Sequence, residues 1–545
     1  MPTPDRTVAG TMVQSLRAHH VDRIFCVAGE SYLPLLDALY DCEVDVLGCR
    51  HEGSAGFAAL ADAKLTGRAG VCLVSRAPGA ANAAIAVHAA AEDATPLVVL
   101  VGDVPTRDLG RESFQSGRPL SDVAKEVLTL YDPAATGETV RRAFRVAESA
   151  TPGPVVVHVP EDVFDRGGAD PPAGRVTLGH TVPDERDFEA VHDLLASAQR
   201  PLLLAGSTLD TVNGRTLLRQ IAQRHGLPVV TSNKNQHLLD NHHPCYAGHL
   251  HNSTQPKQLA EFDRADLVLA VGTRLGQTTT RRLRFPRGPE PDQALVHVYP
   301  DPARIGRYHR VTAGFAMDPV DFLGRLARAG PPHQLPNSRG RWRDGLHAIE
   351  EDNARWIPPD SETVTVGEIA SALDELTAGA VTVIVDSGTF TSWIYRFLRF
   401  ADNGRLVGID SSAMGFAPGA ALAVAARSRA VPTVVIVGDG GFAMNGGELA
   451  TVCERRLPVV FVVSDNASLG TIRLHQQQRY PDRGIATDLT NPDFPQLAAA
   501  YGALGLSATT ATEVRTGLAK ALAHPGPSLL AVRTSRRILT PYRHL

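Results

Sequence analysis

The sequence predicts an α/β protein with three doubly wound domains, each built on a parallel β-sheet. Short apolar segments rich in Val, Ile and Leu alternate with Ala-rich segments, a pattern typical of buried parallel strands joined by helices. Two stretches rich in Gly and Pro, residues 166–186 and 330–341, divide the 545 residues into three parts of ordinary domain size. We therefore expect domains at residues 1–170, 185–335 and 360–545.

The predicted strands are short runs of apolar, often β-branched residues. In the first domain they are residues 23–27, 44–49, 70–75, 97–102 and 154–159. In the second they are 201–205, 228–231, 266–271 and 294–298, and in the third 381–385, 433–437, 459–463 and 528–532. Helix-forming composition predicts helices at 55–65, 80–91, 366–376 and 445–455.

Composition narrows the class of protein. The net charge of −4 and the lack of a Lys/Arg-rich block give no indication of nucleic-acid binding. The amino terminus lacks a charged-then-apolar signal, and no apolar run approaches the roughly 20 residues that span a bilayer. Six cysteines without CxxC spacing, mostly in apolar runs, favour buried free thiols over disulfides or a metal site. We therefore expect a soluble, cytoplasmic protein that binds neither nucleic acid nor membrane.

Residues 431–472 contain the clearest candidate for a ligand-binding site. The first predicted strand of this stretch ends at Gly438, Asp439, Gly440 and Gly441, and Asn466 follows the second. Because the carboxyl ends of parallel strands meet at one edge of a sheet, Asp439 and Asn466 can converge on one point. The glycines allow a phosphate to approach the main chain, the following helix offers free N–H groups, and the two side-chain oxygens suit Mg²⁺. A plain strand-to-helix turn would explain the glycines alone, but the spacing to Asn466 favours a Mg²⁺-clamped diphosphate.

This stretch resembles the Gly-Asp-Gly…Asn sequence of thiamine diphosphate (ThDP) enzymes. Four further segments, residues 50–52, 75–82, 95–97 and 114–115, are similar in order and spacing to the pyrimidine-binding domain of acetolactate synthase-like enzymes. The resemblance extends from about Thr7 to about Val532. It implies pyrimidine-binding, central Rossmann-like and diphosphate-binding domains, and ThDP and Mg²⁺ as cofactors. It also implies a homodimer or dimer of dimers whose active sites lie between the first domain of one subunit and the third domain of another.

The resemblance implies roles for individual residues. Glu52 takes the place of the catalytic glutamate, which protonates the aminopyrimidine ring and so promotes loss of the thiazolium C2 proton. Phe114 and Gln115 take the place of a pair near the reacting centre. The metal ligands would be Asp439, Asn466 and the carbonyl of Ser468. The cofactor contacts would be Ser387, Gly388, Thr389, Ser412, Met414, Gly438, Asp439, Gly440, Gly441, Asn466, Ser468 and Gly470. The candidate substrate pocket comprises Gly29, Glu30, Ser31, His88, Ile472 and His475.

The chain departs from the family at several positions. Met414 takes the place of the bulky apolar residue that bends the cofactor in the family. Ser412, whose carbonyl would accept a hydrogen bond from the cofactor, stands where the family usually has Gly. Thr278 stands where acetolactate synthases have an Arg that faces the acceptor's carboxylate, and Thr cannot make that charged contact. His475 replaces a Trp of the acceptor pocket. Residues 248–254 match the flavin-contacting segment of some relatives poorly, so we expect no FAD.

These observations favour a ThDP-dependent carboligase, which decarboxylates a 2-oxo acid and passes the acyl anion equivalent to an aldehyde or ketone. A 2-oxo acid decarboxylase or a C–C lyase could use the same site. A non-catalytic homologue acting as a binding or regulatory subunit is a further alternative, but it would be expected to lose Glu52, Asp439 or Asn466, and all three are present. A nicotinamide dehydrogenase lacks support because no GxGxxG sequence follows an early strand.

Overall fold

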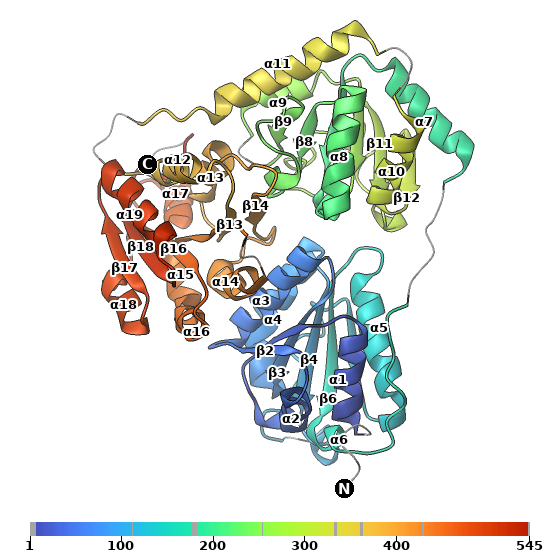
Figure 1. The fold of residues 1–545 in the computed structure, drawn as a ribbon, viewed down its shortest axis with the longest axis vertical. Coiled ribbons are helices and arrows are strands. Elements are labelled where there is room, and N and C mark those ends of the chain that lie inside the picture. The colour runs from blue at the N-terminus through green and yellow to red at the C-terminus, as the bar shows by residue number, and fades with distance from the viewer. Residues whose placement is uncertain are drawn as a thin grey trace.

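The structure, a computed structural model, describes residues 7–111, 113–176, 183–252, 254–331, 335–359, 363–427 and 430–542. Within these residues the chain forms three six-stranded sheets whose neighbouring strands are parallel. Helices cover both faces of each sheet, and the predicted fold class is confirmed. Figure 1 shows the three sheets as separate units, the first in blue, the second in green and the third in orange and red.

The first sheet has the strand order β2-β1-β3-β4-β6-β5. Its strands are β1 (Arg23–Cys26), β2 (Asp45–Gly48), β3 (Gly70–Ser75), β4 (Leu97–Asp103), β5 (Glu126–Thr129) and β6 (Pro154–Pro160). On one face pack α3 (Glu52–Thr66) and α4 (Arg76–Asp93), and on the other α1 (Val8–Ala18) and α5 (Thr136–Glu148). The shorter helices are α2 (Leu33–Tyr40) and α6 (Glu161–Phe164).

The second sheet has the order β12-β11-β10-β7-β8-β9. Its strands are β7 (Pro201–Ala205), β8 (Val229–Thr231), β9 (Tyr246–His249), β10 (Leu267–Val271), β11 (Ala294–Tyr299) and β12 (Ala313–Ala316). One face is covered by α7 (Glu185–Ser197), α8 (Val212–His225) and α10 (Pro319–Ala329). The other is covered by α9 (Pro256–Phe262) and α11 (Asn337–Ala354).

The third sheet has the order β14-β13-β15-β16-β18-β17. Its strands are β13 (Thr382–Val385), β14 (Arg405–Val407), β15 (Thr433–Gly438), β16 (Val459–Asp465), β17 (Leu504–Ala508) and β18 (Ser528–Arg533). On one face lie α14 (Phe416–Arg427), α15 (Asp439–Asn445), α16 (Leu449–Glu454) and α18 (Phe494–Tyr501). On the other lie α12 (Val366–Thr377), α13 (Thr391–Phe397) and α19 (Ala511–Ala523).

Helices α3 and α14 join the first and third domains through a shared apolar core. The rings of Phe57 and Phe416 meet edge to face, with centroids 5.6 Å apart. A Cβ atom on Gly419 would lie 2.9 Å from the carbonyl oxygen of Ser54, so the helices touch where one of them has no side chain. Arg427 extends the interface with ion pairs to two acids of the first domain. The two domains of one chain are therefore packed together, as within a single core.

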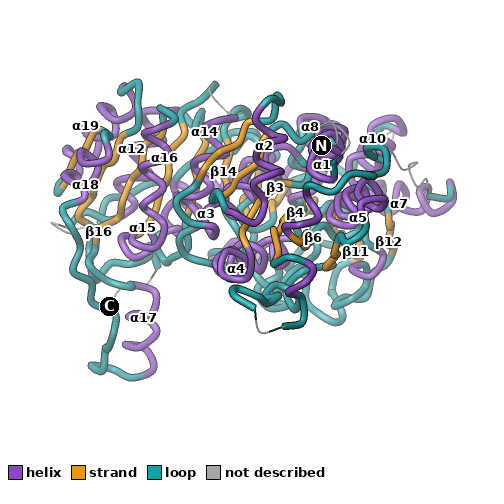
Figure 2. Tube along the Cα trace, turned by 90° about the horizontal axis from the view of Figure 1, so that it is seen from below, coloured by secondary structure: helices purple, strands orange, loops and turns teal. Residues whose placement is uncertain are grey.

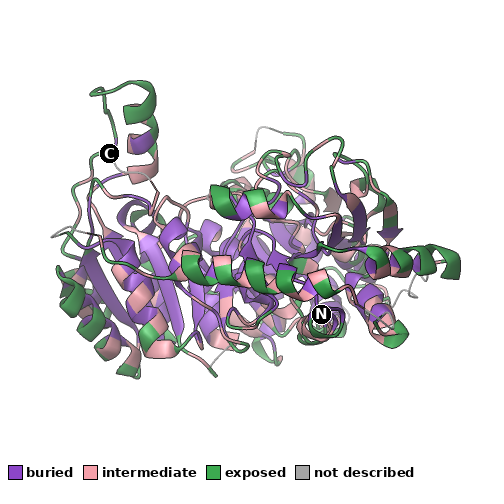
Figure 3. Ribbon diagram, turned by 90° about the horizontal axis from the view of Figure 1, so that it is seen from above, coloured by how far each residue is buried: buried purple, intermediate pink, exposed green. Residues whose placement is uncertain are grey.

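Burial follows the layers, since the inner strands of the sheets are buried and the outward faces of the helices are exposed (Figure 3). Helix α17 (Gly470–Arg479) is the exception, because it projects from the third domain (Figure 2). Leu474 is its one buried residue. None of the helices in the described part of the chain combines the length and apolar character needed to cross a bilayer. All six cysteines are unpaired, and four of them are buried, as the sequence predicts.

Two of the sequence predictions are wrong in detail. The helix predicted at 445–455 is instead two helices, because α15 begins at Asp439 and the chain passes through a 3₁₀ turn, η8 (Gly446–Glu448), before α16. Residues 337–341, predicted to be irregular, form the first turns of α11. Five strands, β5, β9, β12, β14 and β17, were not predicted. Parts of the two predicted linkers, residues 177–182 and 332–334, lie outside the described residues.

Candidate active site

Asp439 lies at the carboxyl end of β15 and begins α15. Its side chain is buried, and its Oδ2 accepts a hydrogen bond of 2.8 Å from Asn491 Nδ2. The same amide nitrogen donates to Asp465 at 2.7 Å, and Asp465 is paired in turn with Arg533. Burial raises the pKa of Asp439, with the charge of Asp465 adding to the effect. A cation bound at Asp439 would favour its charged form, so the chemistry of this position suits a metal ligand.

The loop after β16 brings Asn466 and Ser468 to the same edge of the sheet. In the β15–β16 register Gly438 lies opposite Ser464, so Asp439 and Asn466 follow adjacent strand ends. The amide of Ser468 donates to Asn466 Oδ1 at 3.0 Å, which ties the loop to itself. A Cβ on Gly440 would lie 2.6 Å from a methyl group of Leu469, so the two loops are in direct contact. The predicted metal ligands thus lie on touching loops.

The buried carboxylate of Asp386 organises the rest of this half of the site. It follows β13 and accepts hydrogen bonds from the amides of Ser387, Gly415 and Ala417 at 2.7, 3.0 and 2.9 Å. Burial raises the pKa of Asp386, although the hydrogen bonds from these amides act to lower it. Ser387 Oγ donates to the carbonyl of Ala413 at 2.9 Å. These bonds hold the segment that carries Met414 beside residues 438–441, the candidate diphosphate-binding loop.

Met414 and Ser412 lie in this segment. A Cβ atom added to Gly440 would lie 3.4 Å from the methyl carbon of Met414. The thioether of Met414 therefore lies over the glycine-rich turn at residues 438–441, the glycine turn. Ser412 has φ +58°, in the left-handed region that Gly adopts most readily. A glycine would adopt this conformation more readily than Ser412 does. Thr389, the other candidate contact here, donates its amide to Thr471 Oγ1 at 3.0 Å.

Glu52 lies in the other half of the site, as the first residue of α3. Its Oε2 accepts a hydrogen bond of 2.9 Å from Asn82 Nδ2 on α4. Gly79 lies against its other oxygen, since a Cβ there would be 3.3 Å from Glu52 Oε1. Helix α4 thus fixes one carboxylate oxygen and lets the main chain approach the second. The role of Asn82 was missed, although the residue lies within the segment 75–82 that carries the resemblance.

The substrate-pocket candidates divide between the two halves. Gly29, Glu30 and Ser31 lie in the first domain beside β3, where Ser31 Oγ is 2.9 Å from Ser75 Oγ. His88 is exposed on α4. Ile472 and His475 are exposed on the projecting α17, which belongs to the diphosphate half.

Phe114 and Gln115 belong to the first-domain half. The side chain of Phe114 is 78% exposed. Gln115 Oε1 accepts a hydrogen bond of 3.2 Å from Arg76 Nη1, a contact that sequence reasoning missed because the two residues are far apart in the chain.

Comparison with known proteins identifies the family of the chain. Three family profiles match in order: the thiamine pyrophosphate enzyme N-terminal TPP binding domain at residues 6–122, the central domain at 188–326 and the C-terminal TPP binding domain at 386–532. The chain is 30% identical to the acetolactate synthase large subunit of Parasynechococcus marenigrum, over 97% of this chain and 87% of that protein. The chain belongs to the acetolactate synthase-like family of ThDP enzymes.

Other members of the family show similar likeness. The chain is 29% identical to the acetolactate synthase isozyme 2 large subunit of Escherichia coli, over 96% of this chain and 94% of that protein. It is 28% identical to the probable acetolactate synthase large subunit of Methanocaldococcus jannaschii, over 96% of this chain and 91% of that protein. The predicted resemblance is thereby confirmed, and the protein is a ThDP-dependent enzyme.

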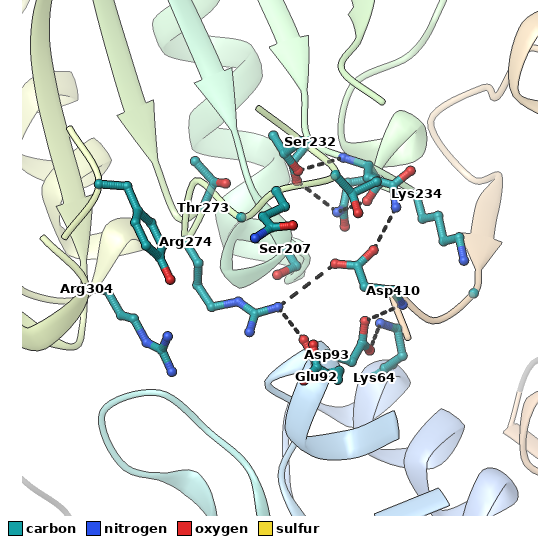
Figure 4. Close-up of a pocket in the computed structure, with 18 residues that line it drawn as sticks. Lys64, Glu92, Asp93, Ser207, Ser232, Lys234, Thr273, Arg274, Arg304 and Asp410 are labelled. Atoms are coloured by element: carbon teal, nitrogen blue, oxygen red, sulfur yellow. Dashed lines mark hydrogen bonds and ion pairs between the residues drawn. The ribbon is translucent and has the colours of Figure 1, made fainter. Parts of the chain in front are cut away.

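This ThDP enzyme also has a cavity of about 420 Å³ where its three domains meet (Figure 4). Asp410 lies at its centre, 3.9 Å from the Arg274 guanidinium and bonded to Asn233 Nδ2 at 2.7 Å. Burial and the neighbouring Asp93 raise the pKa of Asp410. Thr278 lines this cavity. Its lining residues include neither of the two acids predicted for catalysis and metal binding.

Proposed function

We propose that this ThDP enzyme is a Mg²⁺-dependent carboligase, which decarboxylates a 2-oxo acid and transfers the remaining acyl unit to an aldehyde or ketone. The observation that carries the proposal is the pair of half-sites, one built around the buried Asp439 and one around Glu52. The relatives at 28–30% identity, which are named acetolactate synthases, favour carbon–carbon bond formation over simple decarboxylation.

The residues of the third domain fit a Mg²⁺-bound diphosphate. Asp439, Asn466 and the carbonyl of Ser468 are the oxygen ligands that we assign to the metal, since Mg²⁺ binds through few protein oxygens together with phosphate. Gly438 carries no side chain that would cover the first turn of α15, where the diphosphate would bind. When bound, ThDP supplies a nucleophilic carbon that adds to the 2-oxo acid and holds the negative charge left by departing CO₂.

The residues of the first domain supply the proton chemistry. Glu52 exchanges a proton with the aminopyrimidine ring nitrogen through the oxygen that Asn82 leaves free. Gly79 keeps the surroundings of this oxygen uncrowded, because a Cβ atom there would lie 3.3 Å from Glu52 Oε1. Met414 would support the cofactor from the third domain.

We propose that the complete site forms between two copies of the chain. In one chain the side chain of Glu52 contacts α4, and the turn before it contacts Glu448. Asp439 begins α15, and Glu448 ends the 3₁₀ turn η8 that follows it, so the whole of α15 separates Asp439 from the residue that holds the Glu52 turn. Both half-sites expose apolar side chains that a second copy would cover. These are Phe114, Met444, Ile472, Tyr480 and Ile485, which are exposed by 78, 57, 50, 55 and 75%.

We propose that the enzyme works without FAD. Residues 248–254, where some relatives contact a flavin, contain two buried histidines. The rings of His249 and His251 stack with centroids 4.4 Å apart, and His251 meets the Tyr395 ring edge to face at 5.5 Å. The chain's own aromatic side chains thus occupy this region.

The test is product analysis of the purified chain with ThDP, Mg²⁺, a 2-oxo acid such as pyruvate and a series of aldehyde and ketone acceptors. Carboligation predicts CO₂ together with a new hydroxy ketone. Release of CO₂ with only the simple aldehyde would establish a 2-oxo acid decarboxylase instead. Cleavage of hydroxy ketones without ligation would establish a C–C lyase. The matched control is Glu52→Gln, which keeps the hydrogen-bonding shape but cannot exchange the proton and is expected to lose turnover.

A further inference from the structure

Arg76 joins three loops at the carboxyl edge of the first sheet. It is the first residue of α4, directly after β3, and its side chain is 12% exposed. Its Nη1 donates to Gln115 Oε1 at 3.2 Å, in the loop after β4. Its Nη2 donates to Glu161 Oε2 at 2.7 Å, after β6, and lies 3.7 Å from Glu30 Oε2, after β1. One guanidinium group thus links a candidate reaction-centre residue to the ends of two other strands.

Both ends of the contact with Gln115 have an unusual backbone. Arg76 has φ +49° and Gln115 has φ +61°, and neither is a glycine. Such conformations are unfavourable for residues other than glycine and persist where the surroundings over-determine them. Here a second bond supports them, because the amide of Ala77 donates to the carbonyl of Gln115 at 3.2 Å. The loop is therefore clamped at Gln115 by the side chain of one residue and the main chain of the next.

The clamp fixes the direction of the Gln115 carboxamide. A carboxamide can point its oxygen or its NH₂ group to either side, whereas guanidinium carries donors only. Arg76 therefore binds the oxygen, and the NH₂ group of Gln115 faces away from it. The ion pair between Arg76 Nη2 and Glu161 holds the guanidinium group in place, while Nη1 donates to Gln115.

We propose that Arg76 is a positioning residue, which holds the NH₂ group of Gln115 ready to donate to the carbonyl oxygen of the acceptor. This inference rests on the proposed carboligase function. A preorganised donor stabilises the negative charge that this oxygen gains as the carbon–carbon bond forms. Release of CO₂ from the 2-oxo acid does not need this donor. Arg76 therefore controls how much of the decarboxylated substrate is transferred to an acceptor rather than protonated.

The test compares Arg76→Met with Arg118→Met. Arg118 lies in the same loop and binds Thr129 Oγ1 at 2.9 Å and Tyr131 Oη at 3.2 Å, away from Gln115. Arg76→Met is expected to lower the ratio of ligated product to CO₂ about tenfold, the worth of one hydrogen bond, with an unchanged KM for the 2-oxo acid. Arg118→Met is expected to leave the ratio unchanged. Arg76→Lys guards against misfolding, because it keeps the positive charge opposite Glu161. It lacks the planar guanidinium group that reaches both Glu161 and Gln115, so it should shift the ratio of ligated product to CO₂ in the same direction.

A double-mutant cycle shows whether Arg76 acts through Gln115. In a Gln115→Met background, Arg76→Met is expected to cause no further loss of ligated product. The same tenfold loss in that background would overturn the proposal, as would an unchanged ratio in both Arg76 variants.

Hydrogen exchange provides a readout that does not depend on activity. Arg76→Met is expected to speed amide exchange at Ser113 and Ser116, whose N–H groups donate to Arg111 and Ser113, while Arg118→Met leaves their exchange unchanged. Unchanged exchange in Arg76→Met would overturn the clamp itself. If the wild-type enzyme forms no ligated product with any acceptor, the proposed function fails, and exchange alone then decides whether Arg76 holds the loop.

Discussion

Glu448 Oε1 accepts a hydrogen bond of 2.9 Å from the main-chain N–H of Arg50, and the N–H of His51 adds a second at 3.2 Å. Glu448 belongs to the third domain, and its buried side chain lies between that domain and the first. The turn that presents Glu52 is therefore held by the diphosphate domain of its own chain. If Glu52 serves the site of a partner subunit, this contact links the two active sites of a dimer.

Removal of the Glu448 carboxylate is expected to weaken both the fold and catalysis. Glu448→Ala leaves two partly buried N–H groups without their acceptor, which costs about 1 kcal/mol of unfolding free energy, and it also loosens the turn before Glu52. Glu448→Gln retains an acceptor and should lose much less. The control is Glu454→Gln, whose exposed pair with the side chain of Arg50 contributes little. Urea unfolding and kcat measure the effects, and an unimpaired Glu448→Ala enzyme would contradict this account.

Metal dependence is expected to follow Asp439 rather than its neighbour Asp465. Asp439→Asn should abolish Mg²⁺-dependent ThDP binding, because it removes the one acidic ligand that we assign. Asn491→Ala, which removes the amide that orients Asp439, should weaken Mg²⁺ binding roughly 10–100-fold. Asp465→Asn should keep the Mg²⁺ requirement, since Arg533 already neutralises that acid. Calorimetric titration with ThDP at varied Mg²⁺ distinguishes the three variants, and an Asp439→Asn enzyme with normal Mg²⁺-dependent binding would rule out this metal site.

The pH dependence of stability is expected to change when Glu350 is replaced. Burial raises the pKa of Glu350 to about 7, from 4.5. The folded state therefore holds this proton more tightly than the unfolded state, so the contribution of Glu350 to stability is complete below about pH 4.5 and is lost as the pH rises through 7. Glu350→Gln should match the wild type near pH 4.5 and exceed it at about pH 8, by up to about 3 kcal/mol.

The neighbouring acid Glu351 is the control for Glu350. Burial acts to raise the pKa of Glu351, but the hydrogen bond from Arg399 and its positive charge lower this pKa overall. Its contribution to stability is therefore present above its unfolded-state pKa, and Glu351→Gln should destabilise the protein at about pH 8. Urea unfolding at the two pH values measures both variants. A Glu350→Gln variant that is no more stable than the wild type at the higher pH would contradict the assignment.

The fold was predictable from the sequence where strands lie inside a sheet. All five strands that were not predicted, β5, β9, β12, β14 and β17, lie at the edges of their sheets. An edge strand has a neighbour on one side only and needs a weaker apolar pattern, as β17 shows with the sequence LGLSA, of which one residue is buried. Inner strands such as β4, β6 and β7 are buried along their whole length, and their sequences are continuous apolar runs.

The candidate site was predictable where its residues follow strand ends. Asp439 and Asn466 are such a pair, since parallel register brings neighbouring strand ends together. The supporting contacts were not predictable, because they depend on tertiary packing. Glu448 reaches Arg50 across 398 positions of the chain. Arg76 reaches Gln115 across 39 positions, with an uncommon backbone conformation at both residues.

The central claim is that one active site takes Asp439 from one chain and Glu52 from another. Mixing of two inactive variants, Glu52→Gln and Asp439→Asn, after dissociation and reassembly tests it most directly. If the acids come from different chains, each hybrid dimer contains one intact site and one doubly altered site. An equal mixture should then recover about a quarter of the wild-type activity, because half of the dimers are hybrids. If both acids of a site come from one chain, no intact site forms, and a mixture that stays inactive would contradict the account.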